Sequence, residues 1–266
     1  MNDWHRVWRL SRALIQAEVD ARGHSLILYP VGFGTFFVAL TLLAATEPGA
    51  LTGTTQTGLE AALDRYFTSV TGPRFAVALV VVQAPVLVSL FAAVVATPTA
   101  RSLAGRRVSS GEFETLLAVP YTHGEVFGAL VATAFVLALG QTIVLGIVGV
   151  AGAWAVLIAA GAKFSLAVGP VIYAPYLVPL SVALWAALVA TVVYLAYPET
   201  ALSGTGTGNF LLLVALLPAL VLLGLTTTST PISPLIVAVT GFIGVGILTV
   251  VCAAVVGVWL QPSRLL

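Results

Sequence analysis

Charged residues are scarce in this chain. Of its 266 residues only 8% are Asp, Glu, Lys or Arg, whereas 59% are hydrophobic. A soluble domain carries about 25% charged residues, so this composition excludes a water-soluble globular protein. Residues 200–263 contain no formal charge, and residues 126–197 contain only Lys163. We therefore expect most of the chain to lie in a lipid bilayer.

Lysine and cysteine each occur once. Because Lys163 is the only lysine, the chain has no G-x-x-x-x-G-K-[ST] motif and cannot bind ATP as a P-loop does. Cys252 cannot form an internal disulfide, and no Cys/His cluster has metal-ligand spacing. With a net charge of +1 and no long Lys/Arg cluster, nucleic acid is not an expected partner. We expect no metal, cofactor or catalytic site in this chain.

Six apolar segments predict membrane-spanning helices, for which about 20 residues cross about 30 Å of hydrocarbon. Segments 26–46 and 75–97 each predict one crossing. The charge-free run 126–162 is too long for one crossing and tight for two, so we place a third span at 126–150 and a fourth at 171–197. Residues 151–170 would form an interfacial or re-entrant connection. The last two spans are 210–225 and 235–260, and together the six predict an all-α integral membrane protein with one transmembrane domain, 26–266.

Basic residues predict the orientation, because cytoplasmic loops are enriched in Lys and Arg. A cytoplasmic N-terminus leaves only Arg65, Arg74 and Lys163 outside. We therefore expect a multi-pass protein of the plasma membrane with both termini in the cytoplasm. The first 25 residues hold four arginines and three acids before any long apolar run, unlike a signal peptide, so the first span should be uncleaved. The basic residues placed inside are Arg6, Arg9, Arg12, Arg22, Arg101, Arg106, Arg107 and Arg264.

Asp, Glu, His, Lys and Arg are absent from all six predicted spans. Ion-coupled carriers and intramembrane hydrolases place such groups there, despite a cost of about 2.5–3.5 kcal/mol at the bilayer centre. Their absence counts against both classes. A few uncharged polar residues remain within the spans, and they either line a pathway or form hydrogen bonds between helices: Gln83, Gln141, Ser181 and Thr191. Glycines at 146, 149 and 152, and at 241, 244 and 246, predict close helix packing.

Residues 1–25 predict an amphipathic helix on the cytoplasmic membrane surface. At 100° per residue its apolar residues fall on one side and its arginines on the other. The alternative is a generic basic anchor that orients the first span. The residues that carry the interfacial helix are Trp4, Arg6, Val7, Trp8, Arg9, Arg12 and Ile15, with Leu14 on the apolar side.

Residues 101–125 predict a short cytoplasmic helix joined directly to the third span. Ser109-x-x-Glu112 forms one capping box and Thr122-x-x-Glu125 a second, which opens that span. The first helix should cover residues 110–119 and end before Pro120. Its Phe113, Leu116 and Leu117 share one face. An ordinary capped loop helix is the alternative.

This segment resembles a motif of type-2 ABC transporter permeases. Residues 111–120 read Gly-Glu-Phe-Glu-Thr-Leu-Leu-Ala-Val-Pro and are followed by Glu125 and Gly128; the family has G-T-L-E-x-L-L-x-T-P, then E and G. The resemblance implies that residues 110–119 are a coupling helix docked on a cytoplasmic ATPase, and that residues 1–25 are the connecting helix. The ATPase-coupling residues would be Glu112, Phe113, Glu114, Leu116, Leu117, Pro120, His123 and Glu125.

The resemblance also implies a function. The chain would be the permease subunit of an ATP-driven exporter, paired with a second copy or a sister permease, while ABC ATPase subunits bind ATP and Mg²⁺. The uncharged spans favour an apolar or amphiphilic cargo. Two alternatives stay open: a mechanotransmitting or anchor subunit of an ABC complex that moves no solute, and an ion-coupled secondary carrier.

Overall fold

The computed structural model describes residues 3–47, 59–61, 63–64, 71–105, 107, 111, 121–163, 169–197, 207–227 and 234–259. In these ranges the regular structure is helical, apart from one isolated bridge between Thr71 and Lys163. Four helices are long and apolar enough to cross a membrane: Trp4–Thr46, Arg74–Gly105, His123–Ala159 and Ala174–Ala196. The chain is therefore an all-α protein with the long apolar helices of a membrane-embedded one, as its composition predicts.

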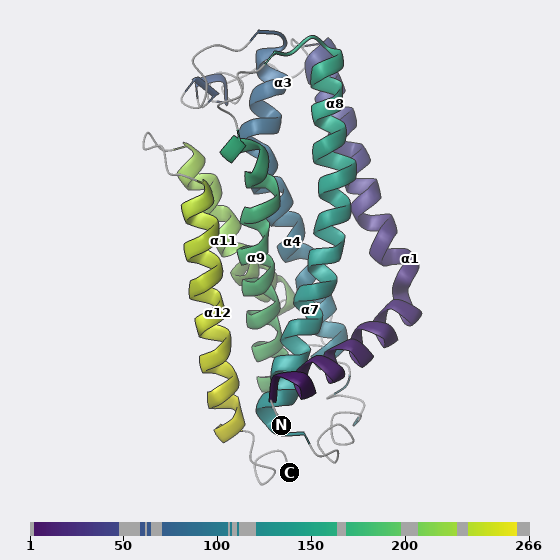
Figure 1. The fold of residues 1–266 in the computed structure, drawn as a ribbon, viewed down its shortest axis with the longest axis vertical. Helices are drawn as coiled ribbons and strands as arrows, with labels where there is room; N and C mark the ends of the chain where they lie inside the picture. Colours follow the sequence, from purple (N-terminus) through teal and green to yellow (C-terminus); the bar gives the residue numbers. More distant parts are fainter. Residues whose placement is uncertain are drawn as a thin grey trace.

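Helix α1 (Asp3–Thr46) bends once, at Arg22, whose φ of −139° and ψ of 16° are not helical. The bend divides α1 into an N-terminal segment, residues 3–21, and a long segment that follows. The N-terminal segment lies across one end of the bundle, and the rest of α1 runs along its side (Figure 1). The boundary predicted at residue 25 therefore lies close to a real change of direction.

The second helical rod consists of α3 (Arg74–Ala78), η2 (Leu79–Gln83), α4 (Ala84–Ala100) and η3 (Arg101–Gly105). The π-helical turns η2 and η3 lie close to Pro85 and Pro98. Proline has no backbone N–H and its ring crowds the preceding turn, so the widened turn η2 accommodates Pro85 without a break in the helix. The rod covers the predicted span 75–97 and continues beyond it to Gly105.

The third rod consists of α7 (His123–Leu145), η4 (Gly146–Ala151) and α8 (Gly152–Ala159). The connection predicted at residues 151–170 is therefore wrong in its first part, because the helix continues to Ala159. Residues 151–159 contain neither proline nor charge, and the helix continues through the π-turn η4, which contains Gly146 and Gly149, without ending. Apolar length alone did not reveal where this helix stops.

Helices α9 (Gly169–Ala196), α11 (Thr207–Thr227) and α12 (Pro234–Trp259) complete the described bundle. The α4–α9 interface is the largest between two helices, and α4 and α9 contribute much of the buried core. Helix α1 packs mainly on α7, η4 and α8, while α11 and α12 lie on the other side of α9 (Figure 1). The apolar stretches described within α11 and α12, Leu211–Val221 and Val239–Val255, are shorter than a full crossing.

Two glycines set the crossing of α1 with the third rod. A Cβ on Gly34 would lie 3.0 Å from the backbone nitrogen of Gly149, and a Cβ on Gly149 would lie 3.0 Å from Cα of Gly34. The backbones therefore touch, as the glycine spacing predicts. Gly241 likewise packs against Ser181 of α9, whereas Gly244 has open space at its Cβ position.

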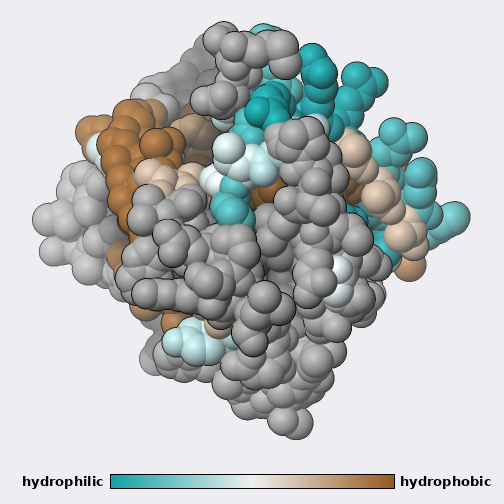
Figure 2. Space-filling model, turned by 90° about the horizontal axis from the view of Figure 1, so that it is seen from below, coloured by the Kyte–Doolittle hydropathy of each residue, from teal (hydrophilic) through white to brown (hydrophobic). Residues whose placement is uncertain are grey.

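The two ends of the bundle differ in their residues. At the end where α3 begins and α8 ends, the backbone nitrogen of Lys163 donates a hydrogen bond to the carbonyl of Thr71 at 3.2 Å, and Arg74 pairs with Asp64. The N-terminal segment of α1 lies at the opposite end (Figure 1). Seen from that end, hydrophilic side chains gather on the α1 side and hydrophobic ones on the α12 side (Figure 2). Thr71 and Lys163, from two segments predicted to lie outside, thus meet at one end of the bundle.

Candidate functional site

The N-terminal segment of α1 is joined to the first turn of α7 by an ion pair. Nε of Arg6 lies 3.4 Å from Oε1 of Glu125, and the Glu125 side chain is only 6% exposed. The Arg6 guanidinium also lies over the ring of Tyr121, 5.2 Å from its centroid. Arg6 was expected on the solvated side of the interfacial helix; instead it reaches back to the bundle, because Glu125 offers a buried negative charge.

Glu125 has a second role as the reciprocal partner in a helix cap. The Thr122 hydroxyl accepts a hydrogen bond from the Glu125 backbone N–H at 3.2 Å, and Oε2 of Glu125 accepts one from the Thr122 N–H at 2.6 Å. The predicted capping box is confirmed. One carboxylate therefore fixes the start of α7 through one oxygen and holds the N-terminal segment through the other. His123, half-buried, is the first residue of this helix.

Hydroxyl groups extend this contact along α7. The Ser11 hydroxyl donates to the carbonyls of Val7 and Ala129, at 2.9 and 3.3 Å, and the Thr133 hydroxyl donates to the Ser11 carbonyl at 3.3 Å. Ser11 and Thr133 are both fully buried. Buried hydroxyls need partners, so these bonds hold the two helices in one register.

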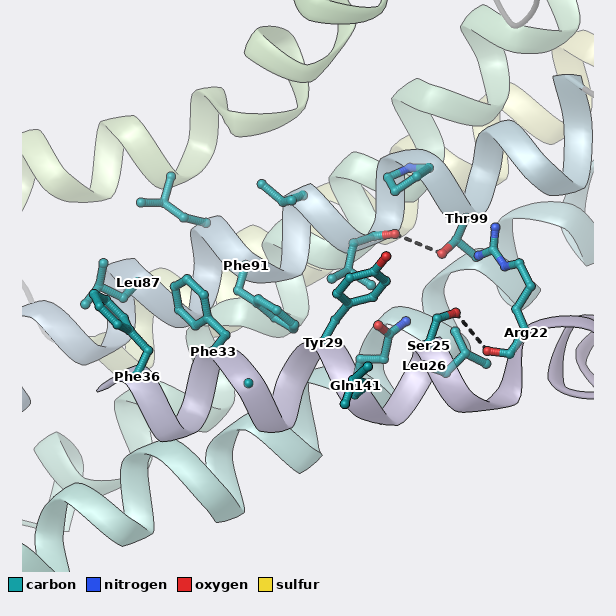
Figure 3. Close-up of a pocket in the computed structure, with 16 residues that line it drawn as sticks. Arg22, Ser25, Leu26, Tyr29, Phe33, Phe36, Leu87, Phe91, Thr99 and Gln141 are labelled. Atoms are coloured by element: carbon teal, nitrogen blue, oxygen red, sulfur yellow. Dashed lines mark hydrogen bonds between the residues drawn. The ribbon is translucent and has the colours of Figure 1, made fainter. Parts of the chain in front are cut away.

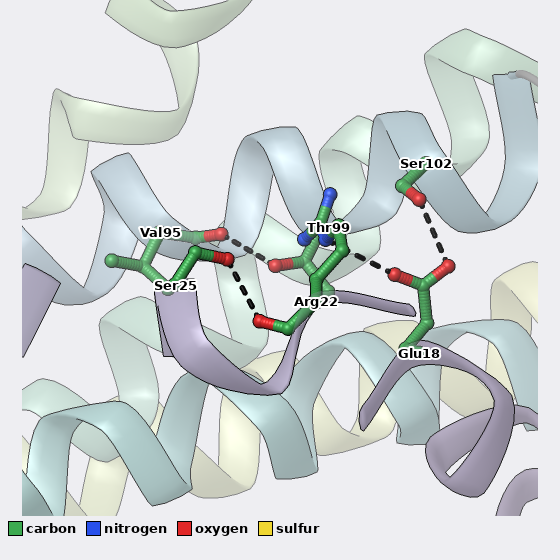
Figure 4. Close-up of polar contacts among 6 residues, drawn as sticks. All are labelled: Glu18, Arg22, Ser25, Val95, Thr99 and Ser102. Atoms are coloured by element: carbon green, nitrogen blue, oxygen red, sulfur yellow. Dashed lines mark hydrogen bonds and ion pairs between the residues drawn. The ribbon is translucent and has the colours of Figure 1, made fainter. Parts of the chain in front are cut away.

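A second contact joins the N-terminal segment to the end of the α4 rod. Glu18, which is 6% exposed, accepts a hydrogen bond from the Ser102 hydroxyl of η3 at 2.8 Å. Its other carboxylate oxygen lies 3.4 Å from Nε of Arg22. Figure 4 shows the Glu18 carboxylate between the two side chains. A buried carboxylate is costly without partners, and here the partners are Ser102 of η3 and Arg22 at the α1 bend.

These two contacts lie on either side of the segment that resembles the coupling motif. Ser102 precedes residues 106–120 and Glu125 follows them, and the same N-terminal segment holds both. The predicted coupling residues Glu112, Phe113, Glu114, Leu116, Leu117 and Pro120 lie outside the described residues. Gly111, which is described, has a φ of +75°, a left-handed conformation that favours glycine.

The predicted apolar face of the N-terminal segment divides into two parts. Leu14 is buried against the bundle with Val7 packed beside it, and so is Leu10, which the prediction did not include in this face. Trp4 and Trp8 are 71% and 49% exposed, so they face away from the bundle, and Ile15 is half-buried. Arg9 and Arg12 are exposed, as expected. An exposed tryptophan edge beside exposed arginines is what a helix on a membrane surface presents.

A long groove opens between the second part of α1 and α4 (Figure 3). Its volume is about 1020 Å³. Phe33 and Phe36 of α1 and Phe91 of α4 lie along one stretch, with the rings of Phe33 and Phe91 5.3 Å apart. Arg22, Ser25 and Thr99 lie at the other end.

The four predicted pathway residues do not come together. Gln141 lines the α1–α4 groove, but Gln83, Ser181 and Thr191 do not. The Ser181 hydroxyl donates to the Val178 carbonyl of its own helix at 2.9 Å, and Thr191 is fully buried. Of the four, Gln141 alone lines this groove.

Sequence reasoning missed Glu18 and the aromatic lining of the groove. Both carry a periodic signal: Glu18 follows Leu10 and Leu14 at steps of four, and Tyr29, Phe33 and Phe36 follow a helical i, i+4, i+7 pattern. Periodicity identifies such a face, but it does not show which helix lies opposite.

Comparison with protein-family models, with characterised proteins and with solved structures finds no match for this chain.

Proposed function

We propose that this chain is the membrane-spanning permease subunit of an ATP-driven ABC transporter that exports its cargo across the plasma membrane, with both termini in the cytoplasm. The observation that carries the proposal is the pair of contacts made by the N-terminal segment of α1. Through Arg6 and Glu18 this segment holds both flanks of the loop that resembles a coupling helix.

The mechanism is mechanical. A force applied to residues 106–120 acts on η3 and on the capped start of α7. Glu125 forms an ion pair with the N-terminal segment of α1, and Ser102 forms a hydrogen bond with the same segment. The force therefore reaches α4, α7 and the N-terminal segment as a unit. The Arg22 bend then provides a point at which the N-terminal segment can swing against the rest of α1. ATP-driven closure of the ATPase subunits would supply the force.

The partners follow from the same proposal. ATP and Mg²⁺ bind to separate cytoplasmic ABC ATPase subunits, because this sequence contains no P-loop. A second copy of the chain or a sister permease forms the other half of the pathway. The exposed Trp4 and Trp8 lie at the bilayer surface.

The proposal is tested by purifying the tagged chain from its native membrane in mild detergent and identifying the proteins that accompany it. We expect an ABC ATPase with the parent chain and none with the Leu116→Asp, Leu117→Asp double variant, whose membrane insertion should be unchanged. Thr115→Asp is a matched control, because it adds an aspartate to the same segment at a position outside the face of Phe113, Leu116 and Leu117.

Equal recovery of the ATPase with the parent and the Asp double variant would overturn the docking assignment. Recovery of the chain alone in all samples, together with ion-driven flux from the purified chain, would replace the proposal with a secondary carrier. ATP hydrolysis without flux in the reconstituted complex would instead identify a mechanotransmitting subunit.

A further inference from the structure

We propose that the groove between α1 and α4 binds one anionic phospholipid of the bilayer, with its phosphate at Arg22 and an acyl chain along Phe33, Phe36 and Phe91. This site does not depend on the transporter proposal, because it is built from α1, α4 and α7 alone. It requires only that these helices lie in a membrane.

The dimensions of the groove fit one leaflet. Its α1 lining runs from Arg22 to Phe36, about 21 Å at 1.5 Å per residue. One leaflet contributes about 15 Å of hydrocarbon, half of the roughly 30 Å core, and the headgroup adds to this. A volume of about 1020 Å³ is at the upper end of the roughly 300–1,000 Å³ typical of small-molecule pockets.

The polarity of the groove also fits an amphiphile. Its aromatic stretch is apolar, whereas the end near the α1 bend carries the Arg22 guanidinium. The hydroxyls at that end already donate to backbone carbonyls, Ser25 to Arg22 and Thr99 to Val95, both at 2.8 Å. Only Nε of Arg22 faces Glu18, and the other guanidinium nitrogens have no hydrogen-bond acceptor among the described residues. They are therefore open to a phosphate oxygen.

Gln141 is the second polar group aimed into the groove. It is 5% exposed as a residue, and its side chain lines the groove. A polar ligand atom in the groove can therefore form a hydrogen bond with this amide. Figure 3 places Gln141 between the Arg22 end and the phenylalanines. In a phospholipid this is where the glycerol ester carbonyls lie, and the amide N–H can donate to one.

The test uses vesicles containing phosphatidylglycerol that carries a diazirine in its acyl chain, with phosphatidylcholine bearing the same chain as the neutral comparison. After illumination, the crosslinked peptides are mapped by mass spectrometry. We expect labelling within residues 26–36 and 87–95, with a preference for phosphatidylglycerol. Arg22→Gln should weaken phosphatidylglycerol binding about tenfold, the loss expected for one charge-assisted hydrogen bond, while Arg22→Lys keeps the preference.

A second variant blocks the groove without altering its polar end. A Cβ on Gly32, a lining residue, would meet nothing within 4 Å, so Gly32→Leu fills open space and leaves the helix packing unchanged. Gly244→Leu on α12 is the matched control, since its Cβ position is equally open and lies outside the groove. Gly32→Leu should abolish labelling of the groove by either lipid, and Gly244→Leu should not.

Three results would overturn the proposal. The first is labelling that persists unchanged in Gly32→Leu, and the second is a phosphatidylglycerol preference that survives in Arg22→Gln. The third concerns another occupant: if a photoreactive phenylalanine analogue at position 36 crosslinks to a second copy of the chain and not to lipid, the groove is a protein interface.

Discussion

Removing the Glu125 carboxylate should loosen the start of α7 and release the N-terminal segment of α1. Glu125→Gln isolates the ion pair, because a glutamine oxygen can still complete the capping box. The 3.4 Å separation from Arg6 is longer than an ideal charge-assisted hydrogen bond, and Arg6 is 30% exposed. We therefore expect a loss of about 1 kcal/mol, the upper range for partly solvated pairs. Glu125→Ala also removes the carboxylate half of the cap, for a total of about 2 kcal/mol.

The assay is thermal unfolding of the purified protein in detergent, in which 1 kcal/mol corresponds to a shift of roughly 2–4 °C for a chain of this size. Arg6→Gln should match Glu125→Gln, and the double variant should be no worse than either single variant, because the two changes remove the same interaction. Arg9→Gln, an exposed arginine of the same segment, is the matched control and should leave the midpoint unchanged. The reasoning is refuted if Arg6→Gln is as neutral as Arg9→Gln, or if the losses simply add.

Three further predictions concern a helix cap, a helix crossing and the orientation of the chain in the membrane. Thr122→Ala should lower stability by about 1 kcal/mol in the same unfolding assay, because it removes the hydroxyl that accepts the Glu125 N–H. Thr35→Ala removes an exposed hydroxyl that donates to the Val31 carbonyl of its own helix, so it should have little effect. Gly149→Leu should lower the free energy of unfolding by about 1–3 kcal/mol, because the larger side chain pushes α1 away from the third rod. Gly244→Leu should leave the midpoint of thermal unfolding unchanged. In a Cys252→Ser background, Lys163→Cys in intact cells should react with a membrane-impermeant maleimide and Arg9→Cys should not; the reverse labelling would invert the proposed orientation.

Much of the helical framework could be predicted from apolar length. Runs without charge coincide with α1, the α4 rod, α7 and α9, since a long apolar run in a bilayer must satisfy its backbone within a helix. The Thr122 cap could be predicted because both partners lie within one turn. The end of the third rod could not, since residues 151–159 contain no local stop signal. The spacing of glycines correctly predicted close packing at Gly149, whose backbone contacts Gly34. It also predicted close packing at Gly244, where the structure has open space.

The candidate site was less predictable because its partners are distant in sequence. Arg6 and Glu125 were both singled out, but for different roles, and nothing local pairs residues so far apart. Glu18 is a charged residue on an otherwise buried stripe, and it is tolerated there only because Ser102 and Arg22 lie next to it. The groove likewise depends on how far α1 stands from α4, which is set by its packing on η4 and α8. Sequence periodicity identifies the aromatic face, and tertiary packing decides whether that face is covered.

The central claim is that a separate ATPase drives this chain, and the most direct measurement is MgATP hydrolysis by the complex purified through the tagged chain from its native membrane. The account predicts hydrolysis that is present with the parent chain and absent from the material purified with the Leu116→Asp, Leu117→Asp variant. A chain that purifies without hydrolytic activity, and without a partner that contains a P-loop, would contradict it.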